Sequence, residues 1–186
     1  RMPEGTCFKR RIIRLHPMVI MGSIVGAAFF YFQESPCFPP IENTSIGTML
    51  LVMLLGCTLL PLPLKFDIRG WTEMHPLNGP AWSLYYEYIG NILYALFVRK
   101  FNKVALSVLV FVAGCFTVYR CLTAPAGDIV GGWALNWEQQ YVGMVRLMYP
   151  FFGGLLLSRL GWLIRLEKRA FWWCSLLIVV VLSIPR

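Results

Sequence analysis

Six long apolar runs, separated by short polar connections, constrain this chain more than any other feature of its sequence. A membrane-spanning helix needs about 17–25 residues to cross a hydrocarbon core of roughly 30 Å, and the runs reach or approach that length. Within lipid only helices and closed barrels satisfy the backbone, and continuous apolar runs without alternation favour helices. We therefore expect an all-α, polytopic transmembrane bundle of about six membrane helices, at residues 15–33, 46–64, 82–98, 104–122, 142–158 and 171–185.

The composition supports lipid as the solvent of this chain. Of its 186 residues, 58% are hydrophobic and 14% are charged, whereas a soluble domain carries about 25% charged residues. The net charge of +8 lies in short clusters between apolar runs, a pattern typical of juxtamembrane segments and not of a nucleic-acid surface. The six cysteines have no metal-ligand or disulfide-framework spacing. We expect a bilayer partner, no nucleic acid and no metal.

The distribution of basic residues predicts how the chain is threaded through the membrane. If all six runs cross, the bases of residues 1–14 lie on the opposite side from those of 99–103 and 159–169, against the positive-inside rule. If one of the first two runs turns back, all of these bases become cytoplasmic and the loop 65–81 faces outward. Pro61 and Pro63 make 46–64 the better candidate for a broken, re-entrant run.

A basic segment, "FKRRIIRLHPMV", precedes the first apolar run. Pro17 suits the first position of a helix, so the sequence predicts a helix that starts there. Bases next to its positive end would form an anion site for cofactor phosphates or lipid headgroups. The alternative is a simple positive-inside anchor. The residues concerned are Arg10, Arg11, Arg14 and His16.

One carboxylate, Glu87, interrupts the third apolar run. On a helix it shares a polar stripe with Ser83, Asn91 and Tyr94, and lipid exposure would be costly, so the stripe should face the protein. Glu87 could act as a general acid or base, orient another catalytic group, or only hydrogen-bond a neighbouring helix. In the loop just upstream, aromatic faces such as Trp82 suit sugar rings.

Arg146 lies within the fifth apolar run, where an unpaired guanidinium would be expensive. It needs a carboxylate, a cavity or an anionic ligand, and Glu87 is the obvious candidate partner. A purely structural ion pair is the alternative. Gly153 and Gly154 should permit close helix approach one turn further on.

These stretches together resemble the acyltransferase-3 family of multi-spanning membrane acyltransferases. The basic segment resembles the family's Arg-x-x-Pro element. "AWSLYYEYIGNILYAL" resembles its Trp-Ser-Leu-x-x-Glu element, and "RLMYPFFGGLLL" resembles its Arg-plus-Phe-x-x-Gly helix. The resemblance covers essentially the whole chain, so we expect residues 1–186 to form part of a single integral-membrane acyltransferase domain.

The chain departs from the family pattern in two ways. After Glu87 the commoner pattern continues Glu-Gln-Phe-Tyr, whereas this chain reads Tyr-Ile-Gly-Asn, which leaves the acceptor open. The family's first helix, with its Arg and its His, has no counterpart here, and His16 does not replace that His. We therefore expect a fragment, inactive alone, that lacks helices at both ends.

The resemblance implies transfer of an acyl group, commonly acetyl, from cytoplasmic acyl-CoA to a hydroxyl of a surface glycan or related sugar, in the cell (inner) membrane. It places Glu87 and Arg146 in the transfer site, as orienter or base and as its charge partner. Arg10, Arg11, Arg14 and His16 would hold the donor, and Asn78, Trp82 and Ser83 would line the acceptor mouth.

Two other classes of function remain open. A transporter or permease segment would use the same buried Glu and Arg for proton or substrate coupling, with broken helices at mid-membrane. Inverted repeats would favour it, and the sequence has none. A membrane scaffold or sensor would use the pair only to hold helices together.

Overall fold

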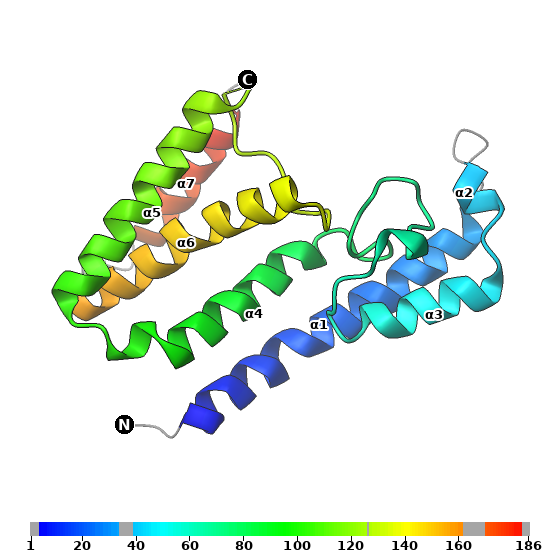
Figure 1. Ribbon diagram of the computed structural model, residues 1–186, viewed down its shortest axis with the longest axis horizontal. Helices are drawn as coiled ribbons and strands as arrows, with labels where there is room; N and C mark the ends of the chain where they lie inside the picture. Colours follow the sequence, from blue (N-terminus) through cyan, green and yellow to red (C-terminus); the bar gives the residue numbers. More distant parts are fainter. Residues whose placement is uncertain (1–3, 34–38, 126, 162–169, 184–186) are drawn as a thin grey trace.

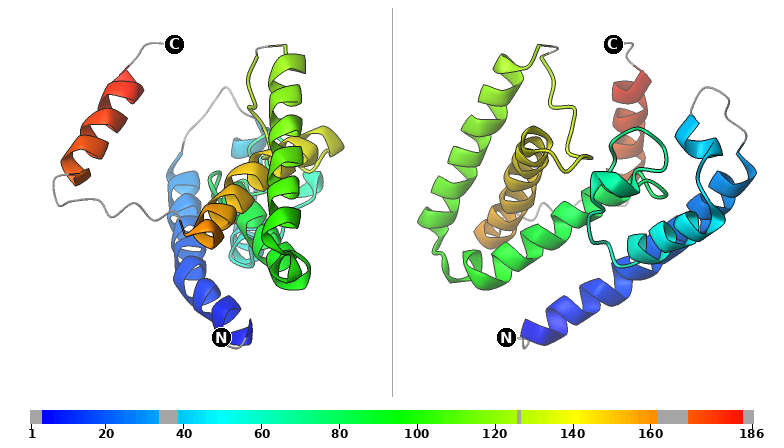
Figure 2. Two further views of the ribbon diagram at one scale, coloured as in Figure 1. Left: turned by 90° about the vertical axis from the view of Figure 1, so that its left-hand side faces the viewer. Right: turned by 45° about the vertical axis from the view of Figure 1, so that its right-hand side comes forward.

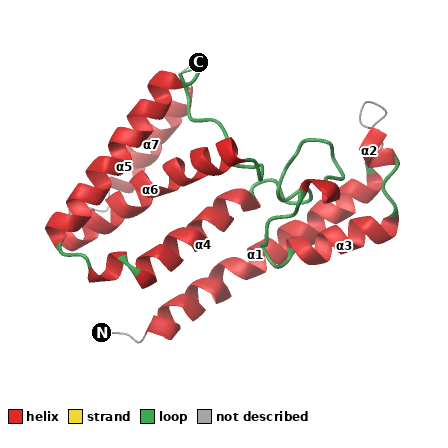
Figure 3. Ribbon diagram, in the orientation of Figure 1, coloured by secondary structure: helices red, strands yellow, loops and turns green. Residues whose placement is uncertain are grey.

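The computed structural model describes residues 4–33, 39–125, 127–161 and 170–183, with the side chains of residues 4–12, 39 and 40 outside that description. The described part is helical without strands, as predicted (Figures 1 and 3). Three segments are long and apolar enough to cross a membrane, namely Ile13–Phe32, Lys103–Thr123 and Trp137–Leu160. The helices are α1 (Glu4–Phe32), α2 (Pro39–Glu42), α3 (Ile46–Gly56), α4 (Ala81–Leu96), α5 (Lys103–Thr123), α6 (Trp137–Leu160) and α7 (Ala170–Ser183).

Helix α1 does not start at Pro17, so that prediction is wrong. It runs from Glu4 to Phe32 with Pro17 inside it. A proline there removes one backbone hydrogen bond but keeps a helical φ, so a helix with good helix formers on both sides can continue through it. Because the chain is already helical before Pro17, the free N–H groups of a helix start are not available at this point. The helix-start part of the predicted anion site is therefore absent here, and the donor site of Arg10, Arg11, Arg14 and His16 stays a prediction that rests on their side chains alone.

The second apolar run is broken, as its prolines predict. Helix α3 has 11 residues, a length of about 16 Å, which is too short to cross the bilayer. The Ser45 hydroxyl caps its start by accepting a hydrogen bond from the Thr48 N–H at 3.2 Å. The helix ends at Gly56, and Leu59 then turns the chain with a φ of +61°. The chain continues as the connection 57–80, which contains a short 3-10 turn at Leu64–Phe66.

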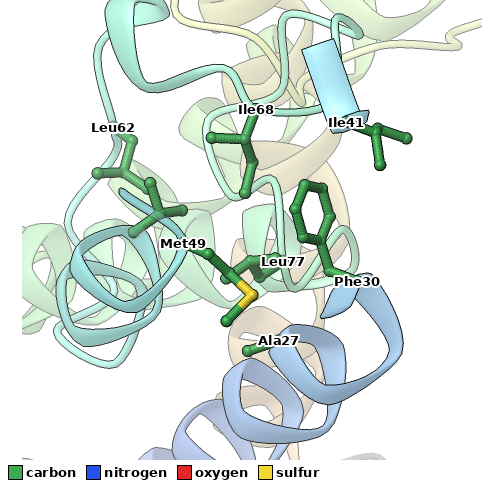
Figure 4. Close-up of a cluster of buried hydrophobic side chains, with 8 residues drawn as sticks. Ala27, Phe30, Ile41, Met49, Leu62, Ile68 and Leu77 are labelled. Atoms are coloured by element: carbon green, nitrogen blue, oxygen red, sulfur yellow. The ribbon is translucent and has the colours of Figure 1, made fainter. Parts of the chain in front are cut away.

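The connection 57–80 packs into a notch in α1 that two glycines create. A Cβ on Gly26 would collide with the Leu77 carbonyl, and one on Gly22 would collide with the Asn78 amide. An apolar cluster of α1, α2, α3 and this connection closes the contact (Figure 4). Its buried members are Ala27, Phe30, Ile41, Met49, Val52, Leu62, Ile68 and Leu77.

Helices α4, α5 and α6 form the other half of the molecule (Figure 1). Helix α6 packs along α5 and also along α4, and α4 and α6 start at the same end. At the opposite end the Arg159 guanidinium donates hydrogen bonds to the Phe101 and Val98 carbonyls at 2.5 and 3.2 Å. The end of α6 is thereby fastened to the turn between α4 and α5.

The glycines that allow close helix contact are not the predicted pair. A Cβ on Gly153 would find its nearest neighbour at 3.9 Å, and one on Gly154 would have none within 4 Å. Gly143 and Gly90 lie at the α4–α6 contact instead, against Tyr86 and Leu147 respectively. Among the described residues, Gly153 would meet only Val110 of α5 at an ordinary contact distance, and Gly154 meets nothing, so neither position needs a glycine for a close helix contact.

The start of α1, the α4–α5 turn and the end of α6 gather at one end of the molecule (Figures 1 and 2). The exposed bases Arg14, Arg99, Lys100 and Lys103 belong to these segments. The connections 57–80 and 124–136 meet away from this end, where α4 and α6 start, and there the Met74 N–H donates to the Trp133 carbonyl at 2.7 Å. Helix α7 lies apart from the rest and has no buried residue (Figure 2).

Candidate functional site

A pocket of about 460 Å³ lies between the first half of α4 and the middle of α6. Helix α4 starts beside it, and the connection 124–136 borders it through contacts with Arg146 and Trp82. Its wall combines one acid, one base, three aromatic rings and several small or apolar groups. The lining residues are Trp82, Ser83, Tyr86, Glu87, Gly143, Arg146, Leu147, Pro150 and Phe151.

Glu87 and Arg146, predicted separately from two apolar runs, line this same pocket. Glu87 is half-buried, but Arg146 is exposed, so the expectation that its side chain is buried is wrong. The pocket opens beside Arg146, which spares the guanidinium the cost of full desolvation. The direct ion pair between the two residues stays a prediction. The structure places a carboxylate and a guanidinium in the wall of one pocket.

Two contacts fix the position of Arg146. Its Nη1 donates a hydrogen bond to the Gly131 carbonyl at 2.7 Å. Its guanidinium carbon lies 4.5 Å from the centre of the Trp82 ring, a cation–π geometry. Arg146 therefore links α6 to α4 and to the connection between α5 and α6.

Glycines at 131 and 132 allow that connection to approach the pocket, and sequence reasoning missed them. Both have positive φ, +143° and +105°, which favours glycine. A Cβ on Gly132 would stand only 3.1–3.3 Å from the backbone of Gly143 and the Trp82 ring. The Gly132 N–H donates to Gln139 Oε1 at 2.6 Å. The glycine pair in "DIVGGW" was the available sequence signal.

The polar stripe of α4 runs from the pocket rim into the protein. Ser83 is exposed and its hydroxyl donates to the Pro80 carbonyl at 2.8 Å. Asn91 is buried and its amide donates to the Glu87 backbone carbonyl at 2.8 Å. Ser83 and Glu87 line the pocket, whereas Asn91 and Tyr94 do not. The stripe thus has a part that lines the pocket and a part that packs inside the protein.

Asn78, predicted to line the acceptor mouth, is placed elsewhere. Its side-chain amide lies over Gly22 and donates to the Val19 carbonyl at 3.3 Å. It is not among the residues that line the pocket. In this structure Asn78 fastens the connection 57–80 to α1.

The predicted donor-binding bases lie on α1. Arg14 is exposed and His16 is half-buried, and neither lines the pocket. The side chains of Arg10 and Arg11 lie outside the described residues, although their backbone belongs to α1. The structure therefore leaves the donor site as a prediction.

His75 is a buried titratable group beside the site. It is 3% exposed, and within the described residues neither ring nitrogen has a hydrogen-bond partner. Its ring packs edge-on near Tyr85, with 6.4 Å between the ring centres. Burial lowers the pKa of His75 from 6.5 to about 4, because the charged imidazolium would lose its hydration. His75 is therefore neutral at physiological pH.

The long apolar helices and the pocket define a multi-pass membrane protein in which a carboxylate and a guanidinium line one pocket. A family model described as an acyltransferase domain matches residues 1–186, so the chain belongs to the acyltransferase 3 family. It is therefore a membrane enzyme that transfers acyl groups. A search of curated proteins and a search of solved structures found no match.

Proposed function

We propose that this enzyme moves an acetyl group from acetyl-CoA to a hydroxyl of a surface glycan or a related sugar, in the cell (inner) membrane. The observation that carries the proposal is the shared pocket of Glu87 and Arg146, with the Trp82 ring as one wall. An aromatic face suits a sugar ring, and the carboxylate suits a reacting hydroxyl. The family membership supplies the class of reaction.

The reaction needs a base at the acceptor hydroxyl, and Glu87 is the carboxylate in the pocket. As the acceptor oxygen attacks the thioester carbonyl carbon, Glu87 takes the hydroxyl proton or orients the group that does. The tetrahedral intermediate then collapses, the carbon–sulfur bond breaks, and the thiolate leaves and takes up a proton. Arg146 holds positive charge beside Glu87 and beside the oxygen that becomes negative.

The donor would enter from the basic end of the molecule. Glu87 lies 12 residues before Arg99 on nearly continuous helix, which corresponds to about 18 Å along the axis. The CoA phosphates would bind near the bases of that end, with Arg10, Arg11 and Arg14 as proposed contacts and His16 as a secondary one. The extended pantetheine arm would carry the thioester toward the pocket. Trp82 and Ser83 would meet the acceptor at the rim.

A transfer assay with labelled acetyl-CoA tests the proposal in membranes that contain the full-length protein. Glu87→Gln should lower acetyl transfer by about 100-fold or more, because general-base catalysis contributes roughly 10²–10⁴-fold. Arg146→Ala should lower it by a similar factor through lost charge stabilisation. Glu42→Gln, which removes an exposed carboxylate of α2, is the charge-matched control. Unchanged transfer in both pocket variants would exclude Glu87 and Arg146 from the mechanism.

A further inference from the structure

Tyr86 is the most deeply buried aromatic residue of the pocket wall. It is 2% exposed, and it lies on α4 directly before Glu87. Its ring lies over Gly143 of α6, where a Cβ would collide with the Cζ and the hydroxyl of the tyrosine. Gly143 also lines the pocket. The Tyr86 hydroxyl is therefore held at the α4–α6 contact, beside the cavity that contains Glu87 and Arg146.

This hydroxyl has no hydrogen-bond partner within the described part of the chain. A buried hydroxyl without a partner destabilises a protein, since it loses its hydrogen bonds to water and gains none. Phenylalanine would fill the same space over Gly143 without that cost. The position therefore carries a polar atom that the fold does not use, next to a cavity large enough for a ligand.

The surroundings of Tyr86 indicate which part of a ligand it would meet. Its ring packs with Leu147, Phe151 and Met74 in an apolar cluster, whereas Ser83 and Arg146 lie at the exposed side of the pocket. A small acyl group suits the apolar side, and a sugar suits the rim with Trp82. A neutral O–H donor on the apolar side matches a carbonyl oxygen better than it matches a polyhydroxy acceptor.

We propose that the Tyr86 hydroxyl donates a hydrogen bond to the carbonyl oxygen of the acyl thioester and stabilises the oxyanion that forms there. The inference rests on the proposed acyl transfer in this pocket. When the acceptor oxygen bonds to the carbonyl carbon, the carbonyl π pair moves onto the oxygen, and the hydrogen bond from Tyr86 strengthens. When the carbonyl re-forms, the carbon–sulfur bond breaks and its electron pair leaves with the thiolate. Tyr86 keeps its proton throughout.

Tyr86→Phe separates this role from a structural one. Because the hydroxyl is unused by the fold, its removal should leave the melting temperature unchanged or raise it. Removal of one oxyanion donor costs about 10²–10³ in turnover in known enzymes, so kcat for acetyl transfer should fall by about 100-fold. The KM for acetyl-CoA should change by no more than about twofold, because the hydrogen bond acts mainly in the transition state.

Tyr85→Phe is the matched control. Tyr85 is the preceding residue of α4, its ring packs against Tyr86 at 5.2 Å between centres, and it does not line the pocket. It should keep kcat within about twofold of wild type. Equal kcat in Tyr86→Phe and wild type would overturn the inference. An equal loss in both variants, or a lower melting temperature for Tyr86→Phe, would overturn it as well, since either result means that the hydroxyl serves packing.

The wild-type measurement distinguishes this inference from the proposed function. Membranes with the full-length wild-type protein that transfer no acetyl group above background contradict the proposed function, and the role of Tyr86 falls with it. Wild-type transfer that depends on Glu87 but not on the Tyr86 hydroxyl contradicts only the inference.

Discussion

At the scale of single residues, Arg146 both holds neighbouring segments together and lines the pocket. Arg146 donates a hydrogen bond to the Gly131 carbonyl and lies over the Trp82 ring. It is also the positively charged residue that lines the pocket. A guanidinium has five N–H donors, and one of them serves the Gly131 carbonyl. The planar fork thus keeps its position while other donors can meet a developing negative charge. Lysine could not reproduce this, because it has no flat face and no fork.

His75 makes stability depend on pH. Its folded pKa of about 4 lies below the ordinary value of 6.5, so the folded state holds the neutral ring. Burial of the neutral ring does not reduce the free energy of unfolding above pH 6.5. That free energy falls as the pH drops from 6.5 toward 4, and His75 causes no further loss below pH 4. Linkage sets the loss at about 3 kcal/mol at most. We expect the melting temperature of the detergent-solubilised protein to fall between pH 7 and pH 4.5.

The variant His75→Phe keeps a ring beside Tyr85 but cannot be protonated. Its melting temperature should vary clearly less over the same pH range than that of the wild type. Parallel curves for the two proteins would show that other groups cause the pH dependence and that His75 is not buried as the structure has it.

At the scale of helices, the contact between α4 and α6 shapes the pocket. Tyr86 lies over Gly143, and Leu147 lies against Gly90, where a Cβ would come within 3.1 Å of it. Each helix therefore offers a glycine to a large side chain of the other. Small residues at helix contacts let side chains and backbones approach closely in membranes. The cavity with Glu87 and Arg146 lies along this contact, so its geometry depends on the two glycines.

A pair of glycine substitutions tests this contact. Gly143→Ala puts a methyl group into the Tyr86 ring, so we expect a loss of about 2 kcal/mol or more, as for overpacked cores, and a large loss of acetyl transfer. Gly154→Ala meets no atom within 4 Å and should raise stability by about 0.5–1 kcal/mol through helix propensity. Thermal unfolding in detergent measures both. Equal stability of the two variants would contradict the packing described here.

The helices themselves were predictable, but their ends and contacts were only partly so. Each of the six predicted runs contains a helix, but within the described residues only three segments are long and apolar enough to cross a membrane, so the expectation of about six membrane helices is met in part. The predicted helix start at Pro17 is wrong. Local propensity favours a start at a proline, but the preceding basic segment is itself helical and α1 continues through Pro17. The prediction of a close helix contact at Gly153 and Gly154 failed because a glycine pair in the sequence does not show which face of the helix a neighbour approaches. That information lies in the relative rotation of α4 and α6.

The two charged residues of the candidate site were predictable from the sequence, whereas the aromatic residues and glycines around them were not. Glu87 and Arg146 stand out in sequence because charges in apolar runs are costly. Tyr86, by contrast, is one aromatic residue in a run that is rich in them. The resemblance predicts Asn78 beside Trp82 at the acceptor mouth, whereas the notch at Gly22 holds its side chain against α1. Tertiary packing decides these positions.

At the scale of the whole molecule, the bases and the pocket lie in different places. The basic segments gather at one end, and the connections 57–80 and 124–136 meet away from that end, where α4 and α6 start (Figure 1). Because α3 is too short to cross, the start of α1 and the α4–α5 turn can share one side of the membrane. By the positive-inside rule we expect this side to be cytoplasmic. If α4 crosses the membrane, the pocket would then lie nearer the outer face, where a surface acceptor would arrive.

Cysteine labelling tests this orientation. In a variant without native cysteines, we expect Lys100→Cys, in the exposed α4–α5 turn, to react with a membrane-impermeant maleimide only after the cells are opened. Asp128→Cys, in the exposed α5–α6 connection, should react in intact cells. The reverse pattern would show that the basic end faces outward.

The central claim is that acyl transfer takes place between α4 and α6, and photolabelling tests it most directly. An acyl-CoA with a photoreactive acyl group is bound to the protein in its membrane, irradiated, and the labelled peptides are identified by mass spectrometry. The account predicts label in residues 82–87 and 143–151, and competition by unlabelled acetyl-CoA. Competed label confined to the outer face of α5 or to α7, with none in those two segments, would contradict it.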